Sequence, residues 1–209
     1  MDNMLHLAFA WLGTATVLSI AVISAKAYDH REGAYASGKA PARSLTHFAY
    51  VYRYLQVSSI AIAIACFWSD WSALAKLPLP IGVRFAGLVG AGFAVAVFIW
   101  SKRTLGKHYS PCFDAYLPKA IVSAGPYQYV RHPIYTANIG LLLALGAATG
   151  SVWLFLNATI LFVYYRHAAI QEEQELSTEH REYEAYIRGT GRFLPVRLIG
   201  TTSNAESSR

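Results

Sequence analysis

Between Arg131 and Arg166 the chain carries no formally charged residue, and this uncharged run constrains the fold more than any other feature. Its apolar part, from about Ile134 to Tyr165, is 32 residues long. A helix crosses a hydrocarbon core of about 30 Å with about 20 residues, so the run is too long for one straight span. The stretch GAATGS, at 146–151, supplies a turn near its middle. The run therefore predicts two helices joined as a tight hairpin.

Three further apolar blocks precede this hairpin. They are Met4–Ala25, about Phe48–Trp68, and Ile81–Trp100. The first block carries Asp2 and no Lys or Arg before it, and it is longer than the apolar part of a signal peptide, so we interpret it as a retained helix. Only 14% of the residues are charged, against about a quarter in soluble domains. We expect an all-α polytopic membrane protein with five transmembrane helices.

The basic residues follow a topological pattern. The net charge is +6, but Lys and Arg lie in the gaps between apolar blocks and form no stripe typical of nucleic-acid binding, so we expect no nucleic-acid partner. Lys/Arg-rich and Lys/Arg-poor loops alternate along the five predicted spans. The positive-inside rule then places the N-terminus outside and the C-terminus in the cytoplasm, and we expect a bacterial inner membrane.

The C-terminal part is polar. A cytoplasmic helix of alternating charge is predicted from about Arg166 to Arg188, ended by Gly189 and Gly191. We divide the chain into a three-span membrane region (1–104), a catalytic region of loop, hairpin and C-terminal helix (105–198), and a disordered tail (199–209).

A glycine-rich stretch, GLVGAG at 87–92, is not interpreted as a nucleotide-binding loop. A dinucleotide site needs a strand before such glycines and a helix that begins at them, whereas these glycines lie inside an apolar block predicted to be a spanning helix. The small residues Ala86, Gly90 and Ala94 share one helical face and are predicted to let a neighbouring helix approach closely.

The most distinctive motif is GPYQYVRHPIY, at 125–135, directly before the long uncharged run. Pro133 suits the first turn of a helix, and the N-terminus of a helix favours a carboxylate or phosphate. Arg131 and His132 add polar groups there, and Tyr127, Tyr129 and Tyr135 offer rings for stacking. One interpretation is an interfacial anchor with an aromatic belt. The other interpretation is a pocket for a zwitterionic ligand with a planar ring, because the acidic residues Glu172 and Glu173 follow the hairpin.

With EEQEL and YEAYIRGTGRFLP after the hairpin, this motif resembles the isoprenylcysteine carboxyl methyltransferase and phospholipid methyltransferase superfamily of integral-membrane enzymes. The resemblance covers about Leu105 to Pro195. It implies S-adenosyl-L-methionine as cofactor, in a pocket that faces the cytoplasm. By position it implies these cofactor contacts: Lys119, Ala120, Ile121, Val122, Tyr127, His132, Pro133, Ile134, Tyr135 and Glu172.

The resemblance leaves the methyl acceptor open between a carboxylate, an amine and a thiol, either lipophilic or small. Prenylcysteine enzymes carry a substrate-holding arginine at the position of Ala168, and Arg166 and His167 lie nearby. We take Arg131, Arg166 and Glu173 as catalytic candidates, and Tyr109, Cys112 and Arg166 as candidate substrate contacts. The histidines at 30, 47 and 180 lack metal-ligand spacing, so no metal site is predicted.

Methyl transfer from a sulfonium requires mainly alignment and desolvation, and the sequence shows no pair of nucleophile and base. Two other functions stay open. One is an NADPH-dependent membrane reductase of the sterol-reductase type, which has a similar C-terminal architecture. The other is a non-catalytic membrane scaffold.

Overall fold

The computed structural model describes residues 2–29, 46–68, 76–106 and 121–196. These residues form helices and connecting segments, with no strand among them beyond two isolated bridges. The long helices are α1 (Asp2–Asp29), α3 (Thr46–Trp68), α4 (Ile81–Leu105), α5 (Pro133–Thr149) and α6 (Val152–Glu179). Two short elements complete the set, the 3-10 helix η3 (Gly125–Gln128) and α7 (Tyr183–Gly189). The all-α prediction is confirmed for this part of the chain.

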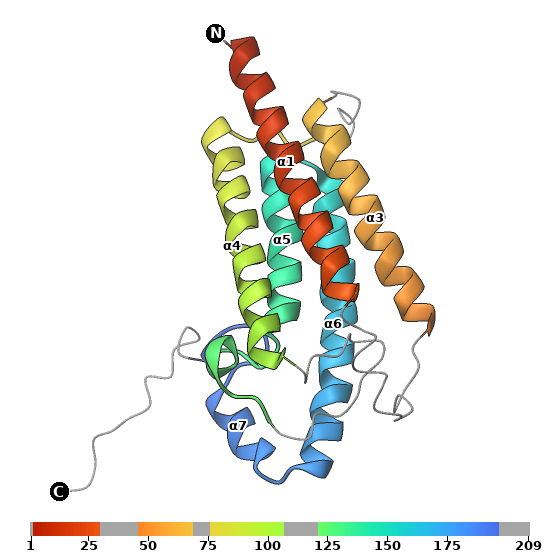
Figure 1. Ribbon diagram of the computed structural model, residues 1–209, viewed down its shortest axis with the longest axis vertical. Helices are drawn as coiled ribbons and strands as arrows, with labels where there is room; N and C mark the ends of the chain where they lie inside the picture. Colours follow the sequence, from red (N-terminus) through yellow and green to blue (C-terminus); the bar gives the residue numbers. More distant parts are fainter. Residues whose placement is uncertain (1, 30–45, 69–75, 107–120, 197–209) are drawn as a thin grey trace, which may run out of the picture.

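The five long helices run side by side along the long axis of the molecule (Figure 1). The end of α4, the start of α5, η3, α7 and the second half of α6 gather at the same end (Figure 1). The motif that the sequence singled out therefore lies at one end of the bundle, beside the C-terminal segment.

The predicted hairpin is present between α5 and α6. Gly150 ends α5 in the left-handed conformation, with φ at +73°. A Cβ at this position would lie 2.7 Å from the carbonyl oxygen of Leu77, whose own N–H donates to the carbonyl of Gly150 at 2.7 Å. Glycine is needed here both for the backbone conformation and for the close approach of the segment before α4.

The close contact between α4 and α5 depends on Gly87. A Cβ on Gly87 would lie 2.5 Å from the backbone nitrogen of Ala148 and 2.6 Å from the carbonyl oxygen of Ala144. Ala91 and Ala94 are buried on the same side of α4. The prediction of a small-residue contact is correct for Gly90, where a Cβ would lie 3.4 Å from that of Ala144, and for the buried Ala94, but Ala86 is exposed and Gly87 makes the closer approach.

The helix predicted from about Arg166 to Arg188 is not a separate, continuous helix, because its first part belongs to α6 and its last part to α7. α6 continues without interruption from Val152 to Glu179, and a turn at 181–182 separates it from α7. Ala169, Glu173 and Leu176 stay buried beyond the apolar run, so tertiary contacts carry the helix on through its polar part. α7 ends at Gly189 as expected. The predicted tail at 199–209 lies outside the described residues.

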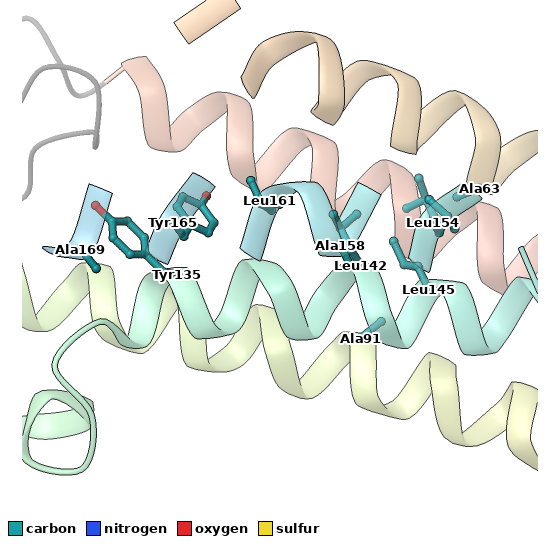
Figure 2. Packing of buried hydrophobic residues seen from close by; sticks show 11 residues of the cluster. Ala63, Ala91, Tyr135, Leu142, Leu145, Leu154, Ala158, Leu161, Tyr165 and Ala169 are labelled. Atoms are coloured by element: carbon teal, nitrogen blue, oxygen red, sulfur yellow. The ribbon is translucent and has the colours of Figure 1, made fainter. Parts of the chain in front are cut away.

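The core lies between α5 and α6 and extends to α4 (Figure 2). Leu142 and Leu145 of α5 meet residues of α6, which include Leu154, Ala158 and Leu161. Tyr135 and Tyr165 continue this core toward the polar end (Figure 2). The apolar core and the polar residues beyond it therefore share the same pair of helices.

The outward faces of the long helices are apolar. Large side chains with more than half of their surface exposed include Trp11, Tyr54, Val89, Phe93, Trp153 and Val163. Among the described residues, α4 alone is long and apolar enough to cross a membrane, and the apolar segments Leu7–Ser19, Tyr54–Trp68 and Pro133–Thr149 are shorter. The five-span topology stays a prediction.

We expect Gly87→Ala to lower the free energy of unfolding by about 1–3 kcal/mol, because the added methyl group meets backbone atoms of α5 that cannot rotate away. The matched control is Gly92→Ala on the same helix, where a Cβ meets nothing within 4 Å. Thermal unfolding of the detergent-solubilised protein measures both. Equal stability of the two variants would contradict the helix contact.

Candidate functional site

The site begins where the chain enters α5. Pro133 is the first residue of this helix and His132 precedes it. The backbone N–H groups of Arg131 and His132 donate to the carbonyls of Gly191 and Arg192 at 2.8 and 3.1 Å. Thr136 adds a hydroxyl that donates to the carbonyl of Phe193 at 3.0 Å. Residues 190–193, which we call the C-terminal strap, are thereby fixed along the start of α5.

The Glu173 carboxylate lies at the centre of the site. Its Oε1 accepts from Arg131 Nε and Arg192 Nε at 3.0 Å and lies 3.0 Å from His132 Nε2. Its Oε2 accepts from Arg192 Nη2 at 2.8 Å and from Arg131 Nη2 at 3.4 Å. The Glu173 residue is 5% exposed, so this anion is buried but has hydrogen-bond donors on both oxygens. One side chain of α6 thus joins the segment before α5 to the strap.

Burial alone would raise the pKa of Glu173. The hydrogen bonds from His132, Arg192 and Arg131 outweigh that effect and hold the pKa of the carboxyl well below its usual range. The same contact raises the pKa of the Arg192 guanidinium. Glu173 is therefore an anion at neutral pH.

Arg131 also fixes α7 and the strap. Its Nη1 donates to the carbonyl of Ile187 at 3.1 Å and to the carbonyl of Thr190. Nearby, Tyr186 donates its hydroxyl to the carbonyl of Tyr127. Burial raises the pKa of Tyr186 to about 12, so this phenol keeps its proton. The side chain of Arg131 is therefore buried and cross-links Glu173, α7 and the strap.

A second carboxylate, Glu172, points to a different part of the site. Tyr135 donates its hydroxyl to Glu172 Oε2 at 3.1 Å, and His132 Nδ1 lies 3.7 Å from the same oxygen. The Glu172 side chain is 38% exposed, in contrast to that of Glu173 at 7%. Glu172 is therefore held in place yet accessible to a ligand.

Tyr135, which holds this second carboxylate, is itself packed between two parallel rings. Tyr135 stacks on His132 with ring centroids 5.2 Å apart and on Tyr165 at 4.3 Å. The rings of Tyr135 and Tyr165 are labelled in Figure 2. Asn138 donates to the Tyr165 hydroxyl at 2.8 Å. Tyr127 and Tyr135 are buried, so their rings belong to the wall of the site and offer no open face for stacking.

The structure brings together five of the predicted residues: Arg131, His132, Tyr135, Glu172 and Glu173. Pro133 and Ile134 lie in the first turn of α5, and Tyr127 lies in η3. Ile121 and Val122 are partly buried in the segment before η3. Lys119, Ala120, Tyr109 and Cys112 lie outside the described residues. The roles assigned to all of these residues stay predictions.

Arg166 is exposed on α6, as is His167, which contacts Gln171 at 2.8 Å between side-chain nitrogens. Ala168, at the position of the family arginine, is buried. Arg166 therefore does not occupy the place of that arginine.

Sequence reasoning missed Arg192, whose guanidinium binds both oxygens of Glu173. The segment GTGRFLP was part of the resemblance, but its arginine received no role. A buried glutamate needs positive partners, but Arg166, Arg181 and Arg188 are nearer to Glu173 in the chain, so the sequence carried no signal that singled out Arg192.

The described residues contain no group of three or more His, Cys, Asp or Glu side chains placed to hold a metal ion. The predicted lack of a metal site stays a prediction, because part of the chain is outside this description.

Comparison with known proteins gives one family and two relatives. Residues 83–182 match the phospholipid methyltransferase family, and this segment contains Arg131, His132, Tyr135 and both glutamates. The chain is 27% identical over 140 residues to the nickel-cobalt-cadmium resistance protein NccN of Alcaligenes xylosoxydans xylosoxydans, which covers 66% of this chain and 61% of the relative. It is 34% identical over 128 residues to the cobalt-zinc-cadmium resistance protein CzcN of Cupriavidus metallidurans, which covers 61% of this chain and 54% of the relative. The chain thus spans little more than half of the length of these relatives.

The depressed pKa of Glu173 makes the stability depend on pH. A carboxyl whose pKa is lower in the folded state contributes stability above its ordinary value of 4.5 and loses that contribution as the pH falls further. We expect the melting temperature of the wild type to fall more steeply below pH 4.5 than that of Glu173→Gln, measured side by side in detergent. Parallel curves for the two proteins would show that the ion cluster does not form.

Proposed function

We propose that the chain is an integral-membrane methyltransferase that uses S-adenosyl-L-methionine, because residues 83–182 match the phospholipid methyltransferase family, which is part of the isoprenylcysteine and phospholipid methyltransferase superfamily. The observation that carries the proposal is the position of Glu172. This half-exposed carboxylate is held by Tyr135 beside His132, inside the matched segment and next to the strap.

The residues present fit such a cofactor. Glu172 and the His132 Nδ1 atom suit a ligand with a positively charged amine, because a carboxylate and an unprotonated imidazole nitrogen both accept N–H hydrogen bonds. Three further contacts implied by the family resemblance, Pro133, Ile134 and Tyr135, follow His132 directly in the first turn of α5. The cofactor would supply a methyl group on a cationic sulfur, which is already a good leaving group.

The protein then has to position the reactants and keep water away. Glu173 with its two arginines fixes the start of α5 against the strap, and Phe193 of the strap lies 6.0 Å from His132 between ring centroids. No nucleophilic side chain is required for a displacement of this kind, and alignment contributes most of the acceleration. Excluding water strengthens the polar contacts of the site.

We propose a lipophilic methyl acceptor. Phe162 is 42% exposed on the outer face of α6, and its ring lies 5.8 Å from that of Phe193. Phe193 in turn lies beside His132, so apolar contacts lead from the outer surface toward the site. An acceptor with an apolar chain would approach along this route from within the bilayer. The names of the two relatives concern metal resistance and specify no methyl acceptor.

The proposed bilayer surrounds the exposed apolar faces of the long helices, since side chains such as Trp11, Val89 and Phe93 are favourable in lipid and costly in water. The Arg/Lys distribution supports a cytoplasmic location for the end with the strap, α7 and Glu172. A cofactor that is made in the cytoplasm would reach the site directly there.

We expect S-adenosylhomocysteine, the product form of the cofactor, to bind the detergent-purified protein, and Glu172→Ala and His132→Ala to weaken that binding at least about 10-fold, because each removes an acceptor for the ligand amine. Calorimetry measures the affinity. Glu179→Gln, an exposed residue of the same helix, is the control for a general charge effect. NADPH is the comparator ligand, and binding of NADPH alone would replace this proposal by the reductase function.

A second measurement concerns the acceptor. With radiolabelled S-adenosylmethionine and membranes from the host, we expect label in the lipid-extractable fraction, and less of it for Phe193→Ala than for the wild type, because the apolar route is interrupted. Label only in water-soluble products would contradict a lipophilic acceptor.

A further inference from the structure

His132 lies between two carboxylates that differ in their surroundings. Its Nε2 is 3.0 Å from Oε1 of the buried Glu173, and its Nδ1 is 3.7 Å from Oε2 of the half-exposed Glu172. The histidine is itself 7% exposed. Its ring is therefore held by the protein on one side and turned toward the accessible part of the site on the other.

The partners of Glu173 decide which nitrogen of a neutral His132 carries the proton. Arg131 and Arg192 approach both oxygens of Glu173 with N–H groups, which can only donate. Glu173 is consequently an acceptor on every side, including the side that faces His132. A short contact between Nε2 and this carboxylate needs a proton on Nε2, so the neutral ring has an unprotonated Nδ1.

An unprotonated Nδ1 facing Glu172 creates a pair of acceptors with no proton between them. A separation of 3.7 Å is too long for a hydrogen bond, and two acceptors repel each other when no donor joins them. A ligand N–H group placed between them satisfies both, and a positively charged amine does so most strongly. Nδ1 of His132 and Glu172 therefore suit a cationic ligand, because the contact with Glu173 keeps the proton of His132 on Nε2.

We propose that Glu173, held by Arg131 and Arg192, is a positioning residue that fixes neutral His132 with its proton on Nε2, so that Nδ1 and Glu172 together accept the N–H groups of one ligand amine. The identity of that ligand, the amine of the S-adenosylmethionine amino-acid group, rests on the proposed function. The position of the proton on His132 does not rest on the proposed function. Glu173 acts through His132 and touches no reacting atom.

This role extends to the strap. Arg192 supplies two of the five N–H contacts of Glu173, and its side chain is 31% exposed, whereas those of Arg131 and Glu173 are nearly covered. Because Arg192 lies in the strap, correct seating of the strap is required to orient the proton on His132. The C-terminal segment thereby contributes to ligand recognition without contacting the ligand amine.

The first test is nitrogen-15 NMR of the wild-type protein in detergent with labelled histidine, in which the signals of His132 are identified by their loss in His132→Gln. The expected result is a neutral ring protonated at Nε2. A neutral ring protonated at Nδ1 would overturn the proposal, and so would a ring that carries protons on both nitrogens at every accessible pH. This test needs no cofactor and no variant of Glu173.

The second test compares the affinities for S-adenosylhomocysteine and for its analogue without the amine. We expect the wild type to prefer the amine-bearing ligand by about 10-fold or more. Glu173→Gln should reduce this preference to about 2-fold, because an amide no longer dictates the proton on His132, and the ratio of the two affinities is independent of any general loss of binding in this variant. Glu179→Gln is the control and should keep the full preference.

Arg192 provides a matched pair of variants at a less buried position. Arg192→Lys retains a cation next to Glu173 and should keep most of the preference for the amine, whereas Arg192→Met should lose it to about the same extent as Glu173→Gln. An unchanged preference in both Glu173→Gln and Arg192→Met would overturn the positioning role. If the wild type binds neither ligand but shows His132 protonated at Nε2, the proposed function fails and the positioning of His132 by Glu173 stands.

Discussion

The structure depends on one buried carboxylate. Glu173 of α6 connects three segments that are far apart in the sequence: the residues before α5, α6 itself, and the C-terminal strap. Isolated, such an anion would be costly to bury, because it loses the solvation that water provides. Five N–H contacts from Arg131, His132 and Arg192 compensate for that loss. The polar end of the bundle is therefore organised around a single charge and its partners.

The apolar part of the bundle places this charge. Gly87 allows α4 and α5 to approach closely, and Gly150 allows α5 to reverse into α6 within two residues. The turn at Gly150 sets the relative height of α5 and α6, and with it the distance between His132 and the glutamates. The small residues in the helix contacts thus help to position the polar residues at the end of the bundle.

Much of this could be predicted from the sequence. The helices of the hairpin, the turn at Gly150 and the start of α5 at Pro133 follow from hydrophobic length and from the backbone preferences of glycine and proline. The small-residue face of α4 was predicted with Ala86 in the place of Gly87, because several small residues lie on neighbouring faces. The continuation of α6 past Arg166 was also missed, since the composition becomes polar there while packing against other segments keeps the helix intact.

The sequence by itself determined the helical elements and the stretch of chain that carries the chemistry, because periodicity, length and turn residues are local properties. Only the tertiary structure decided which of the two adjacent glutamates is buried. Neighbouring residues on a helix point about 100° apart, so Glu172 and Glu173 must face different surroundings. Which one meets the arginines depends on the rotation of α6 against α5 and on the strap, whose Arg192 is 19 residues further along the chain. That partner is set by packing, and no local pattern specifies it.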